Sequence, residues 1–193
     1  MGRRSDHSRA ELEELILAAG EAHLAEAGYA AFSAREVAKR VGYSIGTIFN
    51  LFGSHDRLVL AINGRTLLAW TAFMRARLET QPKDRIGAIV SGYFDFAAEN
   101  RNRWMALYDH RMAGEFELPQ WFLEAFESLI ALLQSEVAAE RPGDSDEQVR
   151  VLTGSFAAIA HGHCMFALNG THSLFGDWDP QAAALARIRQ ALA

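Results

Sequence analysis

The sequence has only one cysteine, Cys164, among its 193 residues. No disulfide can therefore form within the chain, which suits a reducing compartment. The sequence also lacks an apolar run approaching the roughly 20 residues of a membrane-spanning helix, and its amino terminus lacks the apolar segment of a secretory signal. These absences predict a cytoplasmic protein with no membrane partner.

An excess of positive charge is also missing. The chain has 19 basic and 24 acidic residues, which give a net charge of −5. This balance argues against a protein that coats nucleic acid through bulk charge, but a sequence-specific reader needs cations only where it contacts DNA. Arg35, Lys39 and Arg40 form such a local group. Arg3 and Arg4 either add to it as an arm or belong to an untethered tail.

Convincing alternating strand patterns are absent as well, and every periodic segment repeats at helical spacing. Half of the residues are apolar and 22% are charged, as in soluble globular proteins. The sequence therefore predicts an all-α fold of about nine helices, with a small amino-terminal unit and a larger carboxyl-terminal one. We expect the helices over about residues 9–27, 33–41, 44–52, 54–78, 84–97, 103–112, 119–140, 147–168 and from 180 onward.

Residues 33–58 are the most informative part of the chain. Ser33 and Glu36 have the spacing of a capping box at the start of a helix, and Gly42 stands where a left-handed turn would end that helix. Ser44 is then the expected cap of the next helix. Two short helices joined by a tight glycine turn predict a helix-turn-helix, whose second helix reads the major groove of DNA.

The second helix of this motif has two different faces. Helical spacing places Ile48, Leu51 and Phe52 together on the face that would be buried. The opposite face is small and uncharged, and it would carry Ile45, Gly46, Phe49 and Asn50. Such a face is suited to close contact with base edges.

The arrangement resembles the TetR family of one-component transcriptional regulators. The resemblance covers residues 9–58 and is carried by the segments 15–19, 27–29, 36–42 and 44–52. It implies a DNA-binding domain over residues 1–58, followed by a ligand-binding and dimerisation domain over residues 59–193. Beyond Leu58 the resemblance is weak and rests on Trp104 and on the His161-Gly162 pair.

The family's DNA contacts carry over to residues of this motif. By the resemblance, Ser33 and Thr47 would bind phosphates, and Gly46 would let the helix backbone approach base edges. Tyr43 and Asn50 would reach those edges, and Ile45 would pack on a thymine methyl group. The predicted DNA-binding set is Ser33, Tyr43, Ser44, Ile45, Gly46, Thr47, Phe49, Asn50 and His55.

Two members of this set depart from the family pattern. The family usually has tyrosine at the position of Phe49 and lysine at the position of His55. Each difference removes a usual phosphate contact. The resemblance therefore implies a lower DNA affinity than is typical, unless the Arg3 and Arg4 arm recovers it.

Aromatic residues gather in the second half of the chain. Each of them taken singly is best explained as core, but the set exceeds what closely packed short helices need. Polar tips on Trp104, Tyr108 and His161 beside an apolar wall favour a pocket for a hydrophobic small molecule. The predicted ligand-binding set is Trp70, Phe73, Met74, Phe94, Trp104, Tyr108, Trp121, Phe122, Phe126, His161 and Met165.

No enzyme or metal motif is recognisable in the sequence. Glycine-rich phosphate loops, nucleophile elbows and paired metal-ligand motifs are absent. His161 and His163 would point to different sides of a helix, which favours pocket or core side chains over a metal site. We expect no catalytic residue, metal or cofactor. A small helical enzyme or carrier that uses the aromatic cavity is the alternative.

The favoured interpretation is a homodimeric repressor that leaves a palindromic operator in double-stranded DNA when a small effector binds. Two half-sites lie about 34–36 Å apart, or a multiple of that distance, so a rigid dimer must hold the two motifs. The last two helices of each chain would pair as a four-helix bundle. The predicted seam consists of Leu152, Phe156, Ile159, Leu185, Ile188 and Leu192. The alternative is that these residues form the core of their own chain, and part of each stripe must do so.

Overall fold

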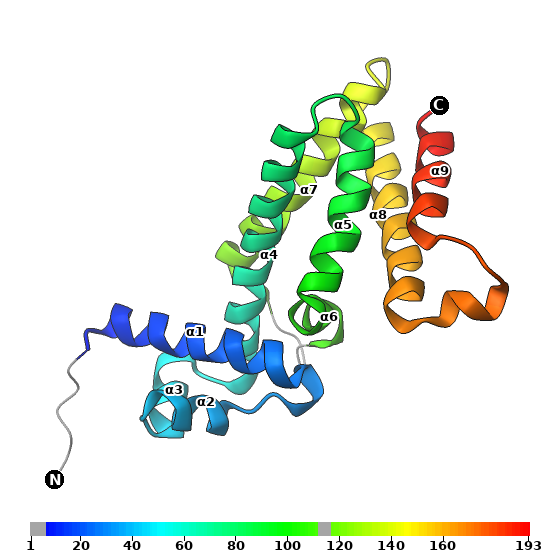
Figure 1. Ribbon diagram of the computed structural model, residues 1–193. Coiled ribbons are helices and arrows are strands. Elements are labelled where there is room, and N and C mark those ends of the chain that lie inside the picture. Colours follow the sequence, from blue (N-terminus) through cyan, green and yellow to red (C-terminus); the bar gives the residue numbers. More distant parts are fainter. Residues whose placement is uncertain (1–6, 112–116) are drawn as a thin grey trace, which may run out of the picture. The chain divides into compact units, whose positions relative to one another are not determined.

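The computed structural model describes residues 7–111 and 117–193, and these residues form an all-α structure (Figure 1). The predicted arm of Arg3 and Arg4, the end of the predicted sixth helix at Met112 and the start of the connection at Gly114 lie outside the described residues. The α-helices are α1 (Arg9–Ala27), α2 (Ala34–Val41), α3 (Ile45–Phe52), α4 (His55–Thr80), α5 (Arg85–Glu99), α6 (Arg101–Asp109), α7 (Gln120–Glu140), α8 (Asp146–Asn169) and α9 (Pro180–Leu192). Two short 3₁₀ helices, η1 (Tyr29–Ala31) and η2 (Thr171–Phe175), complete the list. The predicted fold class is confirmed.

Most helix ends lie at the residues that local signals indicated. For example, Asp179 caps α9 by accepting hydrogen bonds from two backbone amides, and Pro180 opens the helix. The sixth helix differs most, because it begins at Arg101 instead of 103 and ends at Asp109 instead of 112. The backbone becomes extended at His110, whose amide donates to the Ala106 carbonyl at 3.1 Å and closes the helix.

The chain divides into two compact units. The first unit comprises residues 1–66 and 100–122, and the second comprises residues 67–99 and 123–193. The boundary between Thr66 and Leu67 lies inside α4, so this helix supplies side chains to both units. Packing therefore adds the start of α4 and all of α6 to the unit that contains the helix-turn-helix. The functional division after residue 58 stays a prediction.

The first unit packs α1, α2, α3 and the start of α4 around one apolar core. Figure 1 shows α1 crossing above α2 and α3. The core includes Leu12, Ile16, Leu24, Phe32, Val37, Ile48, Leu58, Val59 and Ile62. Gly20 is also buried, and a Cβ atom added there would lie 2.6 Å from Ile62 Cδ1. This atom is the flexible end of the Ile62 side chain, which would have to shift if residue 20 carried a Cβ atom.

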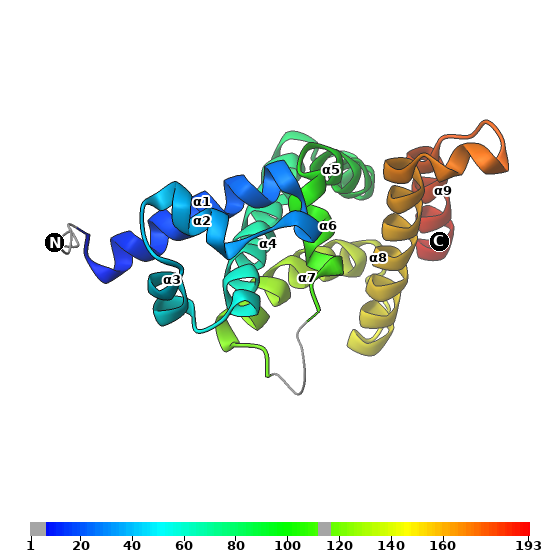
Figure 2. The same cartoon turned by 90° about the horizontal axis from the view of Figure 1, so that it is seen from below.

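The second unit contains α5, most of α7, α8, α9 and the end of α4, and α9 lies beside α8 (Figures 1 and 2). Phe156 of α8 and Ile188 of α9 are 3% and 1% exposed. These two residues therefore belong to the part of each stripe that fills the core of its own chain, and the pairing of α8 and α9 with another chain stays a prediction. Helical period identifies an apolar stripe but does not say which neighbour covers it.

α8 also has a second, outward face. Contrary to the expectation from the sequence, this helix is long and apolar enough by composition to cross a membrane. Only 22% of its most apolar window is buried, so most of that window lies at the surface of the chain. One such helix is weak evidence for a membrane span. The outward stripe consists of Val151, Gly154, Ser155, Ala158, Gly162 and Phe166.

Candidate nucleic-acid interface

The turn between α2 and α3 is built on Gly42, as the sequence predicted. Gly42 has a φ of 74° and a ψ of 23°, in the left-handed region that a side chain disfavours. The Tyr43 amide donates to the Ala38 carbonyl at 3.0 Å, and the Gly42 amide donates to the Lys39 carbonyl at 3.3 Å. These bonds satisfy the last carbonyls of α2 and direct the chain sharply into α3.

The first turn of α3 is fixed by Ser44. The Ser44 hydroxyl accepts a hydrogen bond from the Thr47 amide at 3.1 Å, and the two hydroxyl oxygens lie 3.0 Å apart. The predicted cap is therefore confirmed. Gly46, between these residues, is exposed, and a Cβ atom added there would meet Ser44 Oγ at an ordinary contact distance of 3.5 Å. The start of α3 thus presents backbone to its surroundings with little steric cover.

The two faces of α3 are largely those that periodicity predicted. Ile48 is fully buried, whereas Asn50 is exposed and Phe49 is 36% exposed. Ile45 departs from the predicted outward placement because, like Tyr43, it is half-buried and packs against the core of the first unit. The outward face of α3 is therefore centred on Gly46 and Asn50.

The capping box predicted for Ser33 and Glu36 does not form. The Ser33 side chain makes no capping hydrogen bond. The Ser33 amide instead donates to His23 Nε2 at 3.2 Å, and the Glu36 carboxylate faces Lys39 at 3.7 Å and Arg40 at 3.8 Å. A buried imidazole from α1 has replaced the local partner. Burial lowers the pKa of His23, so its ring is neutral and able to accept this bond.

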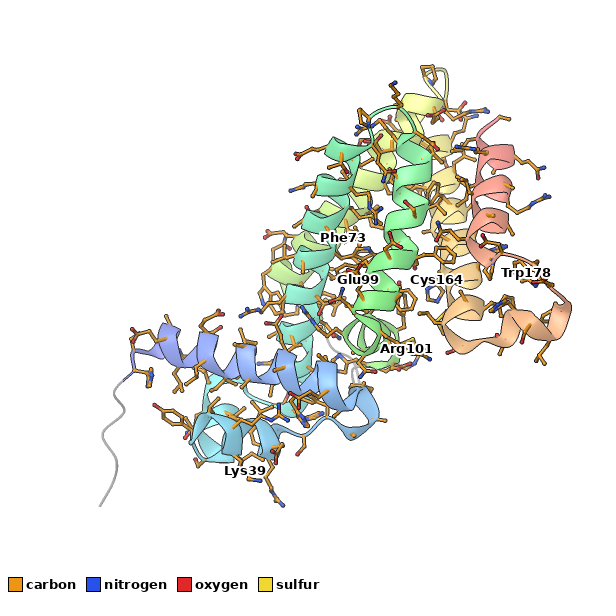
Figure 3. All side chains as sticks on the ribbon, viewed as in Figure 1. Lys39, Phe73, Glu99, Arg101, Cys164 and Trp178 are labelled. Atoms are coloured by element: carbon orange, nitrogen blue, oxygen red, sulfur yellow. The ribbon has the colours of Figure 1, made fainter. Side chains whose placement is uncertain are left out.

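The cations of α2 differ in how readily they can meet a phosphate. Arg40 is held by Glu26 at 2.7 Å, and this hydrogen bond lowers the pKa of the Glu26 carboxyl. The Lys39 side chain is 80% exposed and extends outward from α2 (Figure 3), and Arg35 is also exposed. An exposed ion pair such as that of Lys39 with Glu36 costs little to exchange for a phosphate contact. Lys39 and Arg35 are thus the accessible cations of this helix.

His55 occupies the first turn of α4, after Ser54. The Ser54 hydroxyl accepts from the Arg57 amide at 3.1 Å and so caps the helix. The imidazole of His55 is half-buried, and its ring centroid lies 5.6 Å from that of Phe32. The family pattern, which has lysine at this position, gave no reason to expect this ring contact.

The predicted ligand-binding residues divide between the two compact units. The first unit holds Trp104, Tyr108, Trp121 and Phe122, and the second unit holds Trp70, Phe73, Met74, Phe94, Phe126, His161 and Met165. Within the first unit, Trp104 is fully buried and its ring centroid lies 4.8 Å from that of Tyr108. Trp121 and Phe122 have ring centroids 5.8 Å apart.

The aromatic cluster of the second unit is centred on Trp70. Its ring stacks on Phe96 with centroids 5.5 Å apart and an interplanar angle of 5°, and it meets Tyr93 edge-on at 5.0 Å. Tyr93 Oη lies 3.1 Å from His161 Nδ1, and burial lowers the pKa of that imidazole. Sequence reasoning left Tyr93 and Phe96 out of the ligand set. Their spacing of three residues on one helix face was the signal that could have included them.

The remaining predicted members of this unit have different surroundings. Met74 and Phe94 are buried, Phe73 and Met165 are half-buried, and Phe126 is 48% exposed. A separate surface depression of about 340 Å³ is lined by Asp84, Ile86, Glu140, Arg189, Leu192 and Ala193. None of the predicted ligand-binding residues belongs to that lining.

The His161-Gly-His-Cys164 segment places its side chains in separate environments. His163 Nδ1 lies 2.9 Å from the Ile159 carbonyl oxygen, whereas His161 meets Tyr93. Cys164 is buried, and burial raises the pKa of its thiol to about 12. The thiol is therefore protonated and unreactive at neutral pH. These contacts account for the three side chains as parts of the packed interior of the second unit.

Comparison with known proteins covers both parts of the chain. A sequence profile of bacterial regulatory proteins of the tetR family matches residues 16–62, and a profile of the tetracyclin repressor-like C-terminal domain matches residues 86–189. A search of curated proteins found no match.

Solved structures share the fold over nearly the whole chain. A protein with unknown function from Rhodococcus sp. RHA1 is 20% identical over 99% of this chain and 97% of that chain, with a TM-score of 0.74. The multidrug binding protein EbrR complexed with imidazole is 17% identical over 97% of each chain, with a TM-score of 0.64. A TetR-like transcriptional regulator from Rhodococcus sp. RHA1 is 18% identical over 96% of each chain, with a TM-score of 0.59.

Proposed function

Since the chain belongs to the TetR family of bacterial regulatory proteins, which bind DNA, we propose that it is a repressor released from its operator by a small, largely hydrophobic ligand. The observation that carries DNA recognition is the outward face of α3. Exposed Gly46 and Asn50 lie on a helix whose start is fixed by Ser44, and exposed Lys39 lies on the helix before it. The protein would act on DNA in the cytoplasm.

Substitution of a base-contacting residue and of a phosphate-contacting residue should affect DNA binding differently. Asn50 would hydrogen-bond a base edge, so Asn50→Ala should weaken binding to the preferred duplex and reduce discrimination at one base-pair position, by about 1–3 kcal/mol. Lys39 would contact a phosphate, so Lys39→Ala should weaken binding to all duplexes alike and reduce the log–log salt slope by about 0.9.

Fluorescence anisotropy at several salt concentrations tests this assignment, with one duplex recovered by selection from a random pool and one unrelated duplex. Lys83→Ala is a matched control, because Lys83 is an exposed lysine between α4 and α5 in the second unit. It should leave both affinities unchanged. If the wild-type protein shows no affinity for duplex DNA, the alternative of a helical enzyme or carrier gains support.

The outward stripe of α8 supports homodimerisation through α8 and α9. Val151 and Phe166 are 58% and 40% exposed, and between them lie the small residues Gly154, Ala158 and Gly162. Their spacing of three or four residues places them on one helix face. A Cβ atom added at either glycine would meet no atom within 4 Å, so a partner helix can approach the backbone closely. A second copy of the chain would cover this apolar face.

The aromatic cluster around Trp70 supports a site for an apolar ligand in the second unit. It combines stacked rings with one polar pair, Tyr93 and His161, which is the composition of many small-molecule sites. The structural relative EbrR is described as a multidrug binding protein, which is consistent with this proposal. α4 would transmit the effect, because it carries Leu58 in the core of the first unit and Trp70 in the second.

Ligand action can be tested by linkage. A library of apolar aromatic compounds would be screened for a rise in melting temperature, and each hit would then be added to the protein–DNA complex. A ligand that favours the state with low DNA affinity should weaken DNA binding by about 5–150-fold, and DNA should weaken ligand binding by the same factor. Hits that stabilise the protein without changing DNA affinity would contradict the proposed release.

A further inference from the structure

The turn that leads into α3 has a contact from a distant part of the chain. His7 Nδ1 lies 3.0 Å from Tyr43 Oη, across 36 residues of sequence, and the two rings meet edge-on with centroids 6.3 Å apart and an interplanar angle of 70°. Tyr43 is one of the residues proposed to contact DNA. His7 belongs to no part of the helix-turn-helix motif.

Both ends of this contact are held by their own surroundings. The Tyr43 amide donates to the Ala38 carbonyl, and the half-buried Tyr43 side chain packs against the core of the first unit. His7 directly precedes Ser8, which forms a reciprocal capping box with Glu11 at the start of α1. The hydrogen bond therefore joins two anchored segments, and it restricts the direction in which the Tyr43 hydroxyl can point.

We propose that His7 is a positioning residue for DNA binding, which orients the Tyr43 hydroxyl. With a proton on Nδ1 of the imidazole, this hydroxyl becomes a donor to a DNA phosphate, instead of reaching the base edge that the resemblance implies. The proposal rests on the DNA-binding function proposed above. It adds to that function a residue outside the motif and a dependence on pH.

The number of hydrogens on the Tyr43 hydroxyl limits what it can bind. A tyrosine hydroxyl has one hydrogen and two acceptor sites, and a phosphate oxygen can only accept. A neutral imidazole with its proton on Nε2 accepts the hydroxyl hydrogen at Nδ1, so Tyr43 then has no hydrogen for a phosphate. The other neutral tautomer carries its proton on Nδ1 and donates to Tyr43 Oη, as the imidazolium does. An imidazolium must donate from Nδ1 to Tyr43 Oη, and the hydroxyl hydrogen is then available to the phosphate. Protonation also places a positive charge next to the DNA backbone.

Among the described residues, two titratable groups lie close to His7. On α1, hydrogen bonding from the Ser8 amide lowers the pKa of the Glu11 carboxyl, so an anion remains beside His7. On the turn between α2 and α3, Tyr43 is the titratable group in contact with it.

The test is a double-mutant cycle measured at two pH values. Binding to a duplex selected with the wild-type protein would be followed by anisotropy at about pH 6 and pH 8, which bracket the range in which imidazoles commonly titrate. His7→Ala should weaken binding at the lower pH by about 3- to 10-fold, the effect of one hydrogen bond, and should do less at the higher pH. In a Tyr43→Phe background, most of this effect should disappear, since no hydroxyl remains to be oriented.

His7→Asn provides the conservative rescue. Its amide can donate to Tyr43 Oη without a charge, so it should restore binding at both pH values and make the Tyr43-dependent part insensitive to pH. Effects of pH that are common to every variant cancel in the cycle. Melting curves of each variant would verify that it is folded.

The possible failures are distinguishable. If His7→Ala binds like the wild type at both pH values, or weakens binding equally with and without the Tyr43 hydroxyl, the positioning role is wrong and the proposed function is unaffected. If the wild-type protein binds no duplex at either pH, both proposals are wrong.

Discussion

Replacement of Gly46 by glutamate should abolish specific DNA binding and leave the fold intact. The exposed position accepts a Cβ atom 3.5 Å from Ser44 Oγ, so no backbone shift is needed. Glutamate has a higher helix propensity than glycine by about 0.5 kcal/mol, and a carboxylate in the first turn of a helix adds about 0.3–1 kcal/mol. The free energy of unfolding should therefore rise by roughly 1 kcal/mol, which corresponds to about 2–4 °C in melting temperature for a chain of this size.

The same side chain should be strongly unfavourable against DNA. A carboxylate about 6 Å from one phosphate is repelled by roughly 0.7–2.8 kcal/mol for effective dielectric constants between 80 and 20. Its bulk also keeps the α3 backbone away from base edges. Its negative charge offsets the positive potential at the amino-terminal end of α3, which would otherwise attract phosphates. Together these effects should lower the affinity for the preferred duplex by at least about 100-fold, equivalent to about 2.7 kcal/mol.

Anisotropy and thermal unfolding measured on the same samples separate the two effects. Ala76→Glu is the matched control, since it adds the same charge at an exposed position of α4 and also takes the net charge from −5 to −6. It should bind DNA within about twofold of the wild type, which is less than 0.5 kcal/mol. A Gly46→Glu protein that is folded and binds its duplex like the wild type would refute the placement of α3 in the groove.

Three further predictions concern other parts of the molecule. Ala158→Glu or Gly162→Glu should convert the proposed dimer to a monomer, because an unpaired charge would enter the apolar stripe of α8; light scattering that still gives the dimer mass would place the interface elsewhere. His55→Lys should tighten binding to specific and non-specific duplexes alike and steepen the log–log salt slope by about 0.9, despite losing the ring contact with Phe32; superimposable salt titrations would show that the residue does not face DNA. Stability should fall on acidification through about pH 6.5. Burial lowers the pKa of His23 and His161, so the unfolded chain binds protons that the folded chain does not. In denaturant unfolding at several pH values, the free energy of unfolding of the His161→Gln protein should therefore fall less on acidification than that of the wild type, and an identical fall would contradict this assignment.

The parts of the site that the sequence predicted correctly are those with short-range causes. Gly42 ends α2 because one residue must adopt a positive φ, and Ser44 caps α3 through an amide three residues away. Both signals lie within a few residues of the structure that they specify. The fold class could be predicted for the same reason, because most helices can be recognised from the apolar period and the capping residues of their own segment.

The predictions that failed or stayed open depended on contacts between distant residues. Ser33 and Glu36 have the spacing of a capping box, but His23, ten residues earlier, accepts the Ser33 amide. No local pattern contains that competitor. Phe156 and Ile188 belong to apolar stripes that fit a dimer seam as well as a core, and only the packing of α8 on α9 decides between them. The contact of His7 with Tyr43, across 36 residues, has no sequence signal of its own.

Selection of duplexes from a random pool by the wild-type protein tests the central claim most directly. A homodimer that reads DNA through α3 should enrich a two-fold symmetric site, with half-site centres one helical turn of about 10–10.5 base pairs apart or a multiple of it. The Gly46→Glu protein should enrich nothing in a parallel selection. Absence of any enriched sequence with the wild-type protein, or enrichment of the same site by both proteins, would contradict the account.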